Sequence, residues 1–261
     1  MNILVFGDIV GRGGREAAKL FLEKFKKENE VDFIVINGEN LAHGKGITND
    51  TAKEMFGAGV DVITSGNHIW DVKQALEILQ NNPKVIRPAN FAPTLPGKGS
   101  VLIEKGIYSI AVLNVNGRVF FKENYDDPFM AAEEWFTSLP RVKPLITLVD
   151  NHAEATSEKK ALGFLLDGRV TAVWGTHTHI PTADEQILPQ GTAYISDVGM
   201  TGALNSILGV RPTNVLERFK TQLNVPLEVE EEKPWEVNVI YLTVNQEGKA
   251  TSIKRIREII D

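Results

Sequence analysis

The chain has 261 residues, of which 43% are hydrophobic and 24% charged, a composition typical of a globular protein. It contains no cysteine, which excludes disulfides, thiolate metal sites and cysteine nucleophiles, and it has only five histidines. The net charge of −6 argues against a stable long nucleic-acid partner but is compatible with a small phosphorylated substrate. No run is apolar enough for a membrane helix, and the N-terminus lacks the basic start of a signal peptide, so we expect a cytoplasmic protein.

The first part of the chain predicts strands that alternate with helices. Short apolar runs indicate buried strands, and apolar residues at helical spacing indicate helices. We expect strands at 3–6, 33–37 and 60–64, helices at 15–29, 51–56 and 71–80, a loop at 11–14 and Asp71 as a helix N-cap. This alternation is typical of βαβ units and a largely parallel sheet.

The remainder of the chain predicts a hairpin and then further alternation. We expect strands at 101–104, 108–115, 145–149, 170–174, 192–196, 237–244 and 252–260, helices at 128–139 and 157–166, and a candidate short strand at 85–86. The acidic run at 228–232 is interpreted as a solvated face or an excursion from the core. Because no internal repeat or linker is present, we expect a single domain over 1–261, with a small cap or excursion within about 202–234.

Five predicted strands end at side chains that can bind a metal ion. These are Asp8, Glu39 with Asn40, Asn67 with His68, His152, and His177 with His179. The carboxyl ends of parallel strands open on one edge of a sheet, so these groups would converge. Taken singly, an Asp after a strand is a common turn residue, and a single His is more often hydrogen-bonded structure than a ligand. Four of the five histidines following strands favours a metal site.

Other glycine-rich and serine motifs do not match. Glu16 stands where the last glycine of a dinucleotide-binding loop is required, and the Gly38–Gly44 spacing is one residue too long for a P-loop. No serine lies in the G-x-S-x-G pattern of serine hydrolases. A dinuclear metal site is the interpretation that remains.

Six segments in a fixed order carry a family resemblance. They are FGDIVG at 6–11, NGEN at 37–40, SGNHIWD at 65–71, DNHAEATSEK at 150–159, GTHTH at 175–179 and SDVGMTG at 196–202. This set resembles the calcineurin-like metallophosphoesterase superfamily and, within it, the YmdB-type family of bacterial cyclic-nucleotide phosphodiesterases. Val10 replaces the usual histidine of the first motif, and Glu39 replaces the usual bridging aspartate. Asn40 can fill the vacancy with an amide oxygen, and this Glu-Asn pairing resembles the YmdB-type pattern.

The resemblance implies an α/β fold built on a two-layer mixed β-sandwich flanked by helices. It also implies two divalent or mixed-valence transition-metal ions, with iron or manganese favoured over zinc because the ligands are rich in oxygen. One ion would take Asp8, Glu39, Asn40 and His179, and the other Glu39, Asn67, His152 and His177. A metal-bridging hydroxide would attack phosphorus in line, with His68 as the general acid. The alternative role of His68 is a hydrogen bond that orients Asn67.

The substrate that the resemblance favours is a 2′,3′-cyclic nucleoside monophosphate. A broad phosphomonoesterase or nuclease on the same metals is the alternative enzyme, and a regulatory binding protein with little activity is the alternative class. His43 and Arg12, together with Arg15, are candidates to contact substrate, and Asp150 could orient a ligand imidazole. The glycines of the 199–202 loop could border the pocket. We also expect a homo-oligomer.

Overall fold

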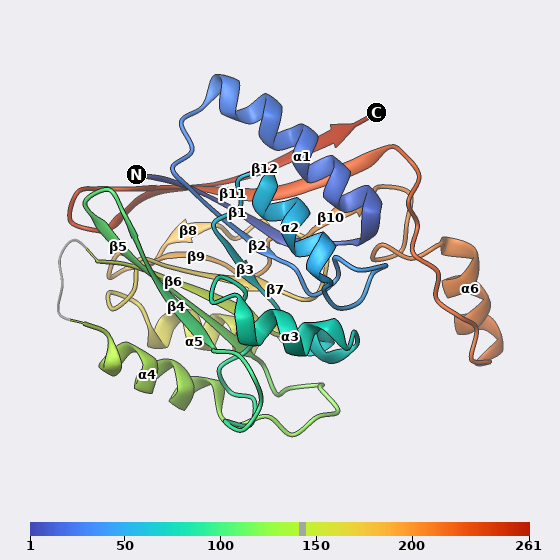
Figure 1. Ribbon diagram of the computed structural model, residues 1–261, viewed down its shortest axis with the longest axis horizontal. Helices are drawn as coiled ribbons and strands as arrows, with labels where there is room; N and C mark the ends of the chain where they lie inside the picture. The colour runs from blue at the N-terminus through green and yellow to red at the C-terminus, as the bar shows by residue number, and fades with distance from the viewer. Residues whose placement is uncertain (141–144) are drawn as a thin grey trace.

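Two six-stranded sheets pack face to face between outer layers of helices in the computed structural model, which describes residues 1–140 and 145–261 (Figure 1). In spatial order the first sheet contains β12 (Ala250–Ile260), β11 (Trp235–Val244), β10 (Met200–Ala203), β1 (Asn2–Ile9), β2 (Phe33–Asn37) and β3 (Val62–Thr64). The second sheet contains β4 (Ser100–Lys105), β5 (Tyr108–Asn116), β6 (Leu145–His152), β7 (Ala172–Thr176), β9 (Ala193–Ile195) and β8 (Gln186–Ile187). The predicted two-layer mixed sandwich is therefore confirmed.

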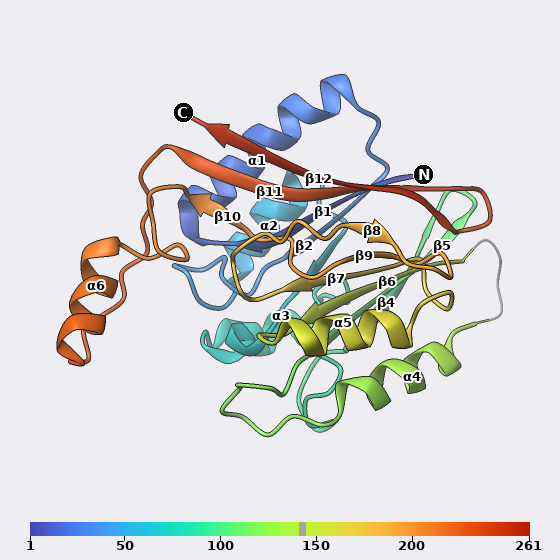
Figure 2. The same cartoon turned by 180° about the vertical axis from the view of Figure 1, so that it is seen from behind.

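The helices cover the two outer faces, apart from the last one, which projects from one end of the sandwich (Figures 1 and 2). They are α1 (Gly11–Glu28), α2 (Asn49–Gly57), α3 (Gln74–Asn81), α4 (Pro128–Ser138), α5 (Thr156–Leu165) and α6 (Pro212–Thr221), and a 3₁₀ turn, η1, spans Asn67–Trp70. In Figure 1, α1 and α2 lie on the side of the first sheet, and α4 and α5 lie on the opposite side of the molecule. Among the described residues, no helix is long and apolar enough to cross a membrane.

Three apolar clusters explain why the strands are continuous hydrophobic runs. In β1, Ile3 and Val5 face the second sheet, whereas Leu4 and Phe6 pack toward the helices on the first sheet. In β5, Ile110 contributes to the cluster between the sheets, and alternate residues pack toward α4 and α5. Strands that are covered on both faces bury every side chain, so they do not alternate with polar residues.

Parallel pairing places the important strand ends together. β1, β2 and β3 are parallel neighbours in the first sheet, and β5, β6 and β7 are parallel neighbours in the second. The predicted hairpin is confirmed as β4 and β5, and the closing strand as β12, which pairs antiparallel with β11. Val85 forms only an isolated bridge with Ile63, so the candidate strand at 85–86 is reduced to one pair.

The expected loop at 11–14 is wrong, because α1 already begins at Gly11. The first N–H groups of a helix lack a partner within the helix, and in α1 a residue far along the chain supplies one. The Glu231 carboxylate accepts hydrogen bonds from the backbone N–H groups of Arg12 (3.2 Å) and Gly13 (2.5 Å). Gly14 is required by packing, since a Cβ there would lie 2.4 Å from the Thr201 carbonyl oxygen. The acidic run at 228–232, expected as a solvated face or an excursion from the core, is exposed at Glu228 and Glu232, whereas Glu231 is half-buried against the start of α1.

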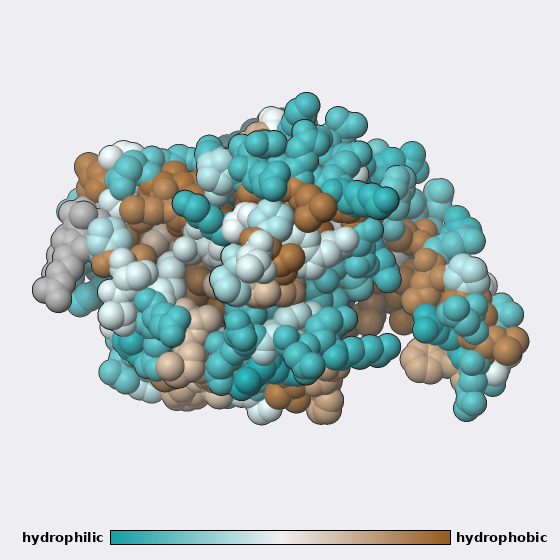
Figure 3. All heavy atoms as spheres, turned by 60° about the horizontal axis from the view of Figure 1, so that its bottom comes forward, coloured by the Kyte–Doolittle hydropathy of each residue, from teal (hydrophilic) through white to brown (hydrophobic). Residues whose placement is uncertain are grey.

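Three elements of the second half are absent from the predictions: β8, β10 and α6. β10 is short and contains Gly202, but it is fixed by pairing with β1 and β11. α6 projects from one end of the sandwich in both ribbon views (Figures 1 and 2). The space-filling view shows hydrophobic surface on this projection, to which the exposed Leu216 and Phe219 contribute (Figure 3).

Candidate metal centre

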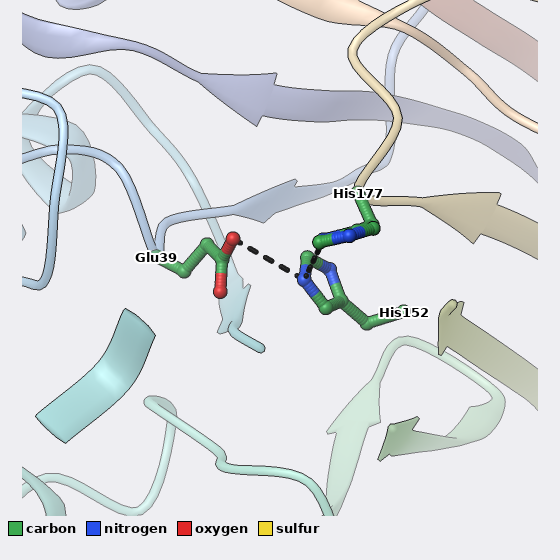
Figure 4. Close-up of side chains that lie close together, drawn as sticks. All are labelled: Glu39, His152 and His177. Carbon is green, nitrogen blue, oxygen red and sulfur yellow. Dashed lines mark hydrogen bonds and ion pairs between the residues drawn. The ribbon is translucent and has the colours of Figure 1, made fainter. Parts of the chain in front are cut away.

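Glu39, His152 and His177 point toward one another at the edge where the strand ends meet (Figure 4). Nε2 of His152 lies 3.2 Å from Oε1 of Glu39 and 3.1 Å from Nδ1 of His177. Glu39 follows β2 of the first sheet, whereas His152 ends β6 and His177 follows β7 of the second. The cluster is thus assembled from both layers of the sandwich, and these three residues could together hold a metal ion.

The orientation of His152 is fixed by a buried relay. Its Nδ1 lies 2.9 Å from Oγ1 of Thr176, and that hydroxyl donates to Oδ1 of Asp150 at 2.7 Å. Because the Thr176 hydroxyl donates its proton to Asp150, it can only accept a hydrogen bond from His152, so Nδ1 of His152 carries the proton. The lone pair of His152 is therefore on Nε2, which faces the cluster. Asp150 acts on this imidazole through Thr176, and Thr64 also donates to its carboxylate at 2.5 Å.

His177 is oriented by a carboxylate on its outer side. Its Nε2 lies 3.1 Å from Oε2 of Glu154, so the ring proton belongs on Nε2 and the lone pair on Nδ1. Three hydrogen-bond acceptors then face one another with no donor between them: Nδ1 of His177, Nε2 of His152 and the Glu39 carboxylate. Such a group requires a shared proton or a cation. The donor set fits a transition-metal ion, for which imidazole and carboxylate are ordinary ligands.

The pKa values of Glu39 and His152 also indicate that this cluster favours a positive charge. Burial raises the pKa of Glu39, but the adjacent His152 outweighs burial and lowers that pKa to about 2. Burial lowers the pKa of His152, but the carboxylates of Glu39 and Asp8 outweigh it and raise that pKa to about 9. Burial, reinforced by the neighbouring His152, lowers the pKa of His177 to about 3. The carboxylates thus favour a cation in their midst.

Asn67 and Gly66 complete this side of the centre. Oδ1 of Asn67, at the start of η1, lies 3.1 Å from Nε2 of His152. A Cβ on Gly66 would lie 2.2 Å from Nε2 of His152 and 2.4 Å from Oε2 of Glu39. Only glycine leaves this space free, which is what a cradle for an ion requires.

A second set of donors lies beside the first. The Oδ1 atoms of Asp8 and Asn40 are buried without a hydrogen-bond partner in the described chain. Nδ1 of His179 lies 3.0 Å from the Leu208 carbonyl oxygen, to which it donates, and Nε2 lies 3.9 Å from Oδ1 of Asp8. Buried oxygens usually have a partner, so these two, beside the Glu39 and His152 cluster, fit the ligands of a cation. Interatomic distances therefore join six of the seven residues expected as metal ligands, and for Asn40 the structure shows only that its Oδ1 is buried without a hydrogen-bond partner among the described residues.

His68 lies at the rim of the cluster, on η1. Its backbone N–H donates to Oε2 of Glu39 at 2.9 Å, and its Nδ1 lies 2.9 Å from Oδ2 of Asp71. The expectation that Asp71 caps a helix is wrong, because α3 begins only at Gln74 and the Asp71 carboxylate is engaged by His68. With Nδ1 held by a carboxylate, Nε2 of the partly exposed imidazole is the nitrogen left to act on a ligand.

The candidate substrate contacts are not joined to this cluster. His43 is exposed, and no hydrogen bond or ion pair joins its side chain to the centre within the described part of the chain. Arg12 is exposed and contributes only its backbone N–H to Glu231. Arg15 is engaged elsewhere: it donates to Glu54 at 2.6 Å and to the Leu41 carbonyl at 2.5 Å.

Sequence reasoning missed four residues that shape the centre. Gly66, Asp71, Glu154 and Thr176 were all inside recognised motifs, but no role was assigned to them as neighbours of the ligands. For Asp71 a signal existed, because it follows His68 by three residues, the spacing of one helical turn. For Glu154 and Thr176 no local signal could reveal which imidazole each contacts.

A two-sheet sandwich flanked by helices, with carboxylate and imidazole groups gathered at its strand ends, fits the metallophosphoesterase fold that the motifs predict. The fold is similar to that of a putative 5′-nucleotidase from Staphylococcus aureus, with a TM-score of 0.64, 16% identity and coverage of 100% of this chain and 55% of that one. The chain belongs to the YmdB-like protein family, whose model matches residues 4–256. The family predicted from the motifs is thereby confirmed.

Two further relatives are similar over nearly their full length. The chain is 45% identical, over 98% of its length and 96% of the relative, to the 2′,3′-cyclic-nucleotide 2′-phosphodiesterase of Bacillus subtilis (strain 168). It is also similar to the crystal structure of a novel phosphatase from Mycoplasma pneumoniae, with a TM-score of 0.93, 34% identity and coverage of 100% of this chain and 94% of that one.

Proposed function

We propose that the protein is a dinuclear-metal phosphodiesterase that hydrolyses 2′,3′-cyclic nucleoside monophosphates. The observation that carries this proposal is the convergence of Glu39, His152 and His177 in a chain 45% identical to a 2′,3′-cyclic-nucleotide 2′-phosphodiesterase. The identity supports the substrate class, and the cluster supplies groups suited to hydrolysis of a phosphate ester.

Two ligand sets follow from the donors described above. Glu39, Asn67, His152 and His177 would hold one ion, and their mutual distances support this set. Asp8, Asn40 and His179 would hold the other with Glu39, and the two unpartnered buried oxygens support that set. Because all the donors are oxygen or imidazole, iron or manganese suits the site at least as well as zinc.

Bound metal ions would lower the pKa of a water molecule and neutralise charge on the phosphoryl oxygens. The chain itself must deliver a proton to the ribose oxygen that leaves phosphorus. We assign this step to Nε2 of His68, because Asp71 holds Nδ1 at 2.9 Å and the backbone of His68 is fixed to Glu39.

A phosphomonoesterase on the same centre is the second candidate. The similarity to a structure described as a phosphatase favours it. An assay of the metal-loaded protein with 2′,3′-cAMP, 3′,5′-cAMP, a phosphomonoester and single-stranded RNA separates the candidates. We expect 2′,3′-cAMP to be hydrolysed fastest. Faster turnover of the monoester or of RNA would overturn the substrate choice.

Metal analysis tests the centre independently of substrate. We expect about two transition-metal ions per chain, by analogy with two-metal hydrolases. Fewer than one bound ion, not restored by added Mn²⁺ or Fe²⁺, would overturn the dinuclear centre and favour a regulatory binding protein.

We also expect a homo-oligomer formed by single-domain chains. The exposed Leu216, Phe219 and Leu223 on and beside α6 support this expectation, because monomers rarely leave several large apolar side chains together in water. Sedimentation velocity tests it, and a monomer over the micromolar range would contradict it.

A further inference from the structure

The loop that joins β5 to α4 is fastened to the metal centre by its backbone. The N–H of Gly117 donates to the carbonyl oxygen of His152 at 2.8 Å. The next two N–H groups, of Arg118 and Val119, donate to the buried carboxylate of Glu158 at 2.9 and 3.3 Å. Since Glu158 lies on α5, directly after the strand that carries His152, this loop is held in a fixed position beside the cluster.

Two phenylalanines follow these anchored residues. The Phe121 ring lies 4.8 Å from the His177 imidazole, centroid to centroid, and is therefore in direct contact with the centre. Phe120 is 82% exposed and has a φ of 70°, in the left-handed region that bulky residues avoid. An unburied phenyl group on a strained backbone contributes nothing evident to the core, and such outliers gather at ligand sites.

Phe121 is one end of a continuous row of aromatic rings. Phe121 contacts Tyr125 at 5.7 Å, Tyr125 contacts Phe91 at 5.0 Å, and Phe91 contacts Trp70 at 5.9 Å, all between ring centroids. Trp70 belongs to η1, the same turn that carries Asn67 and His68. The row thus runs from the His177 side of the centre to the segment that bears the proposed proton donor.

We propose that Phe120 and Phe121 form a stacking subsite for the nucleobase of the substrate. This inference rests on the proposed function. A nucleotide whose phosphate sits at the metal centre extends its ribose and base outward, and the base is a flat ring with an apolar face. Aromatic side chains stack on all four bases, because every base has a π face. The subsite therefore confers preference for nucleotides over base-free phosphate esters, with little discrimination among bases.

The test compares a substrate that has a base with one that lacks it. 2′,3′-cAMP and glycerol 1,2-cyclic phosphate share a five-membered cyclic diester, but only the former can stack. We expect Phe120→Leu and Phe121→Leu each to raise KM for 2′,3′-cAMP about tenfold, within the range for a lost base–aromatic stack, while kcat changes little. Turnover of glycerol 1,2-cyclic phosphate should fall much less than that of 2′,3′-cAMP in both variants.

Two control variants sharpen this comparison. Phe120→Tyr keeps an aromatic face and should retain the wild-type KM for 2′,3′-cAMP. Phe219→Leu removes an equally exposed ring, 80% accessible, from the projecting α6 and should leave both substrates unaffected. The subsite is overturned if the Leu variants at 120 and 121 leave the kinetics of both substrates unchanged. It is also overturned if they slow both substrates equally, because that pattern indicates a disturbed His177.

A binding measurement tests the stacking subsite independently of the proposed phosphodiesterase activity. Calorimetry of the metal-loaded protein with 3′-AMP and with glycerol 2-phosphate needs no turnover. We expect 3′-AMP to bind at least tenfold more tightly, and Phe120→Leu to reduce that preference. Equal affinities would overturn the subsite even if 2′,3′-cAMP is hydrolysed. Absence of cyclic-phosphate turnover together with tight 3′-AMP binding would overturn the proposed activity alone.

Discussion

Nζ of Lys159 lies 2.5 Å from Oδ2 of Asp197, and the two side chains are only 1% and 2% exposed. The same carboxylate oxygen accepts hydrogen bonds from the backbone N–H and the hydroxyl of Thr178 at 3.2 and 2.8 Å. Thr178 lies between His177 and His179, whose φ angles of 98° and 65° are both in the left-handed region. The buried ion pair therefore supports a strained loop that carries two expected ligands.

Breaking this pair should destabilise the fold. Lys159→Met leaves the Asp197 carboxylate buried without its cation, and loss of one partner of a buried pair costs about 3–5 kcal/mol. Urea unfolding measures the change in the free energy of unfolding. Lys27→Met, which breaks the exposed pair with Glu23, is the control and should cost less than about 1 kcal/mol. Equal costs for the two variants would contradict a structural role for the buried pair.

Gly66→Ala should fold and yet lose metal. The backbone of Gly66 is extended, with φ −160° and ψ −146°, and the added methyl would occupy the space between His152 and Glu39. Metal content after dialysis should fall below that of the wild type, while the far-ultraviolet circular dichroism spectrum is retained. Gly57→Ala is the matched control, because no atom lies within 4 Å of its added Cβ. Full metal occupancy in Gly66→Ala would refute this position of the ion.

Metal binding should stabilise the protein against heat. An ion that binds only the folded chain adds about 2.7 kcal/mol when its free concentration is a hundred times Kd. We expect Mn²⁺ to raise the Tm of the chelator-treated wild type. Glu39→Gln should abolish most of this rise, because it removes the carboxylate charge shared by the two ligand sets. Glu133→Gln, on the exposed surface pair with Arg169, should retain it. A rise of equal size in Glu39→Gln would count against the assigned ligands.

His68→Gln should slow turnover with little loss of metal. Removing a general acid costs about 10²–10⁴-fold in kcat, and neither ligand set includes the His68 imidazole. Asp71→Asn should give a smaller loss, because it weakens the hydrogen bond that orients Nδ1. Steady-state kinetics and metal analysis on the same preparations check both variants. Unchanged kcat in His68→Gln would remove this residue from proton transfer.

The Arg15–Glu54 contact predicts a pH-dependent stability effect. Burial raises the pKa of Glu54, but hydrogen bonds from Lys19 and Arg15 outweigh burial and hold the pKa below 4.5, its ordinary value. The stabilisation is therefore present above pH 4.5 and lost as the pH falls through the lowered folded pKa. Glu54→Gln should cost up to about 1 kcal/mol near pH 7 and progressively less in acid. Glu23→Gln is the control on α1, and a pH-independent cost at position 54 would contradict the assignment.

Local patterns in the sequence predict the strands and the donors at their ends, because each is a property of a few consecutive residues. The helical start at Gly11 was missed because its acceptor, Glu231, is 218 residues away from Gly13. The burial of Lys159 was missed as well, because helical periodicity cannot show that Asp197 lies within hydrogen-bonding distance of it in the folded chain. Short elements such as β10 exist through pairing with β1 and β11, which no local pattern encodes.

Glu39 is presented by the first sheet, and His152 and His177 by the second, so a cation held among them spans the interface between two separately hydrogen-bonded layers. Hydrophobic contacts between sheets are tolerant of small sliding movements, whereas coordination distances are not. If a metal ion binds there, its affinity should depend closely on how the two layers are aligned. Core substitutions far from the centre, for example at Ile110 between the sheets, should register as weaker metal binding before they register as unfolding.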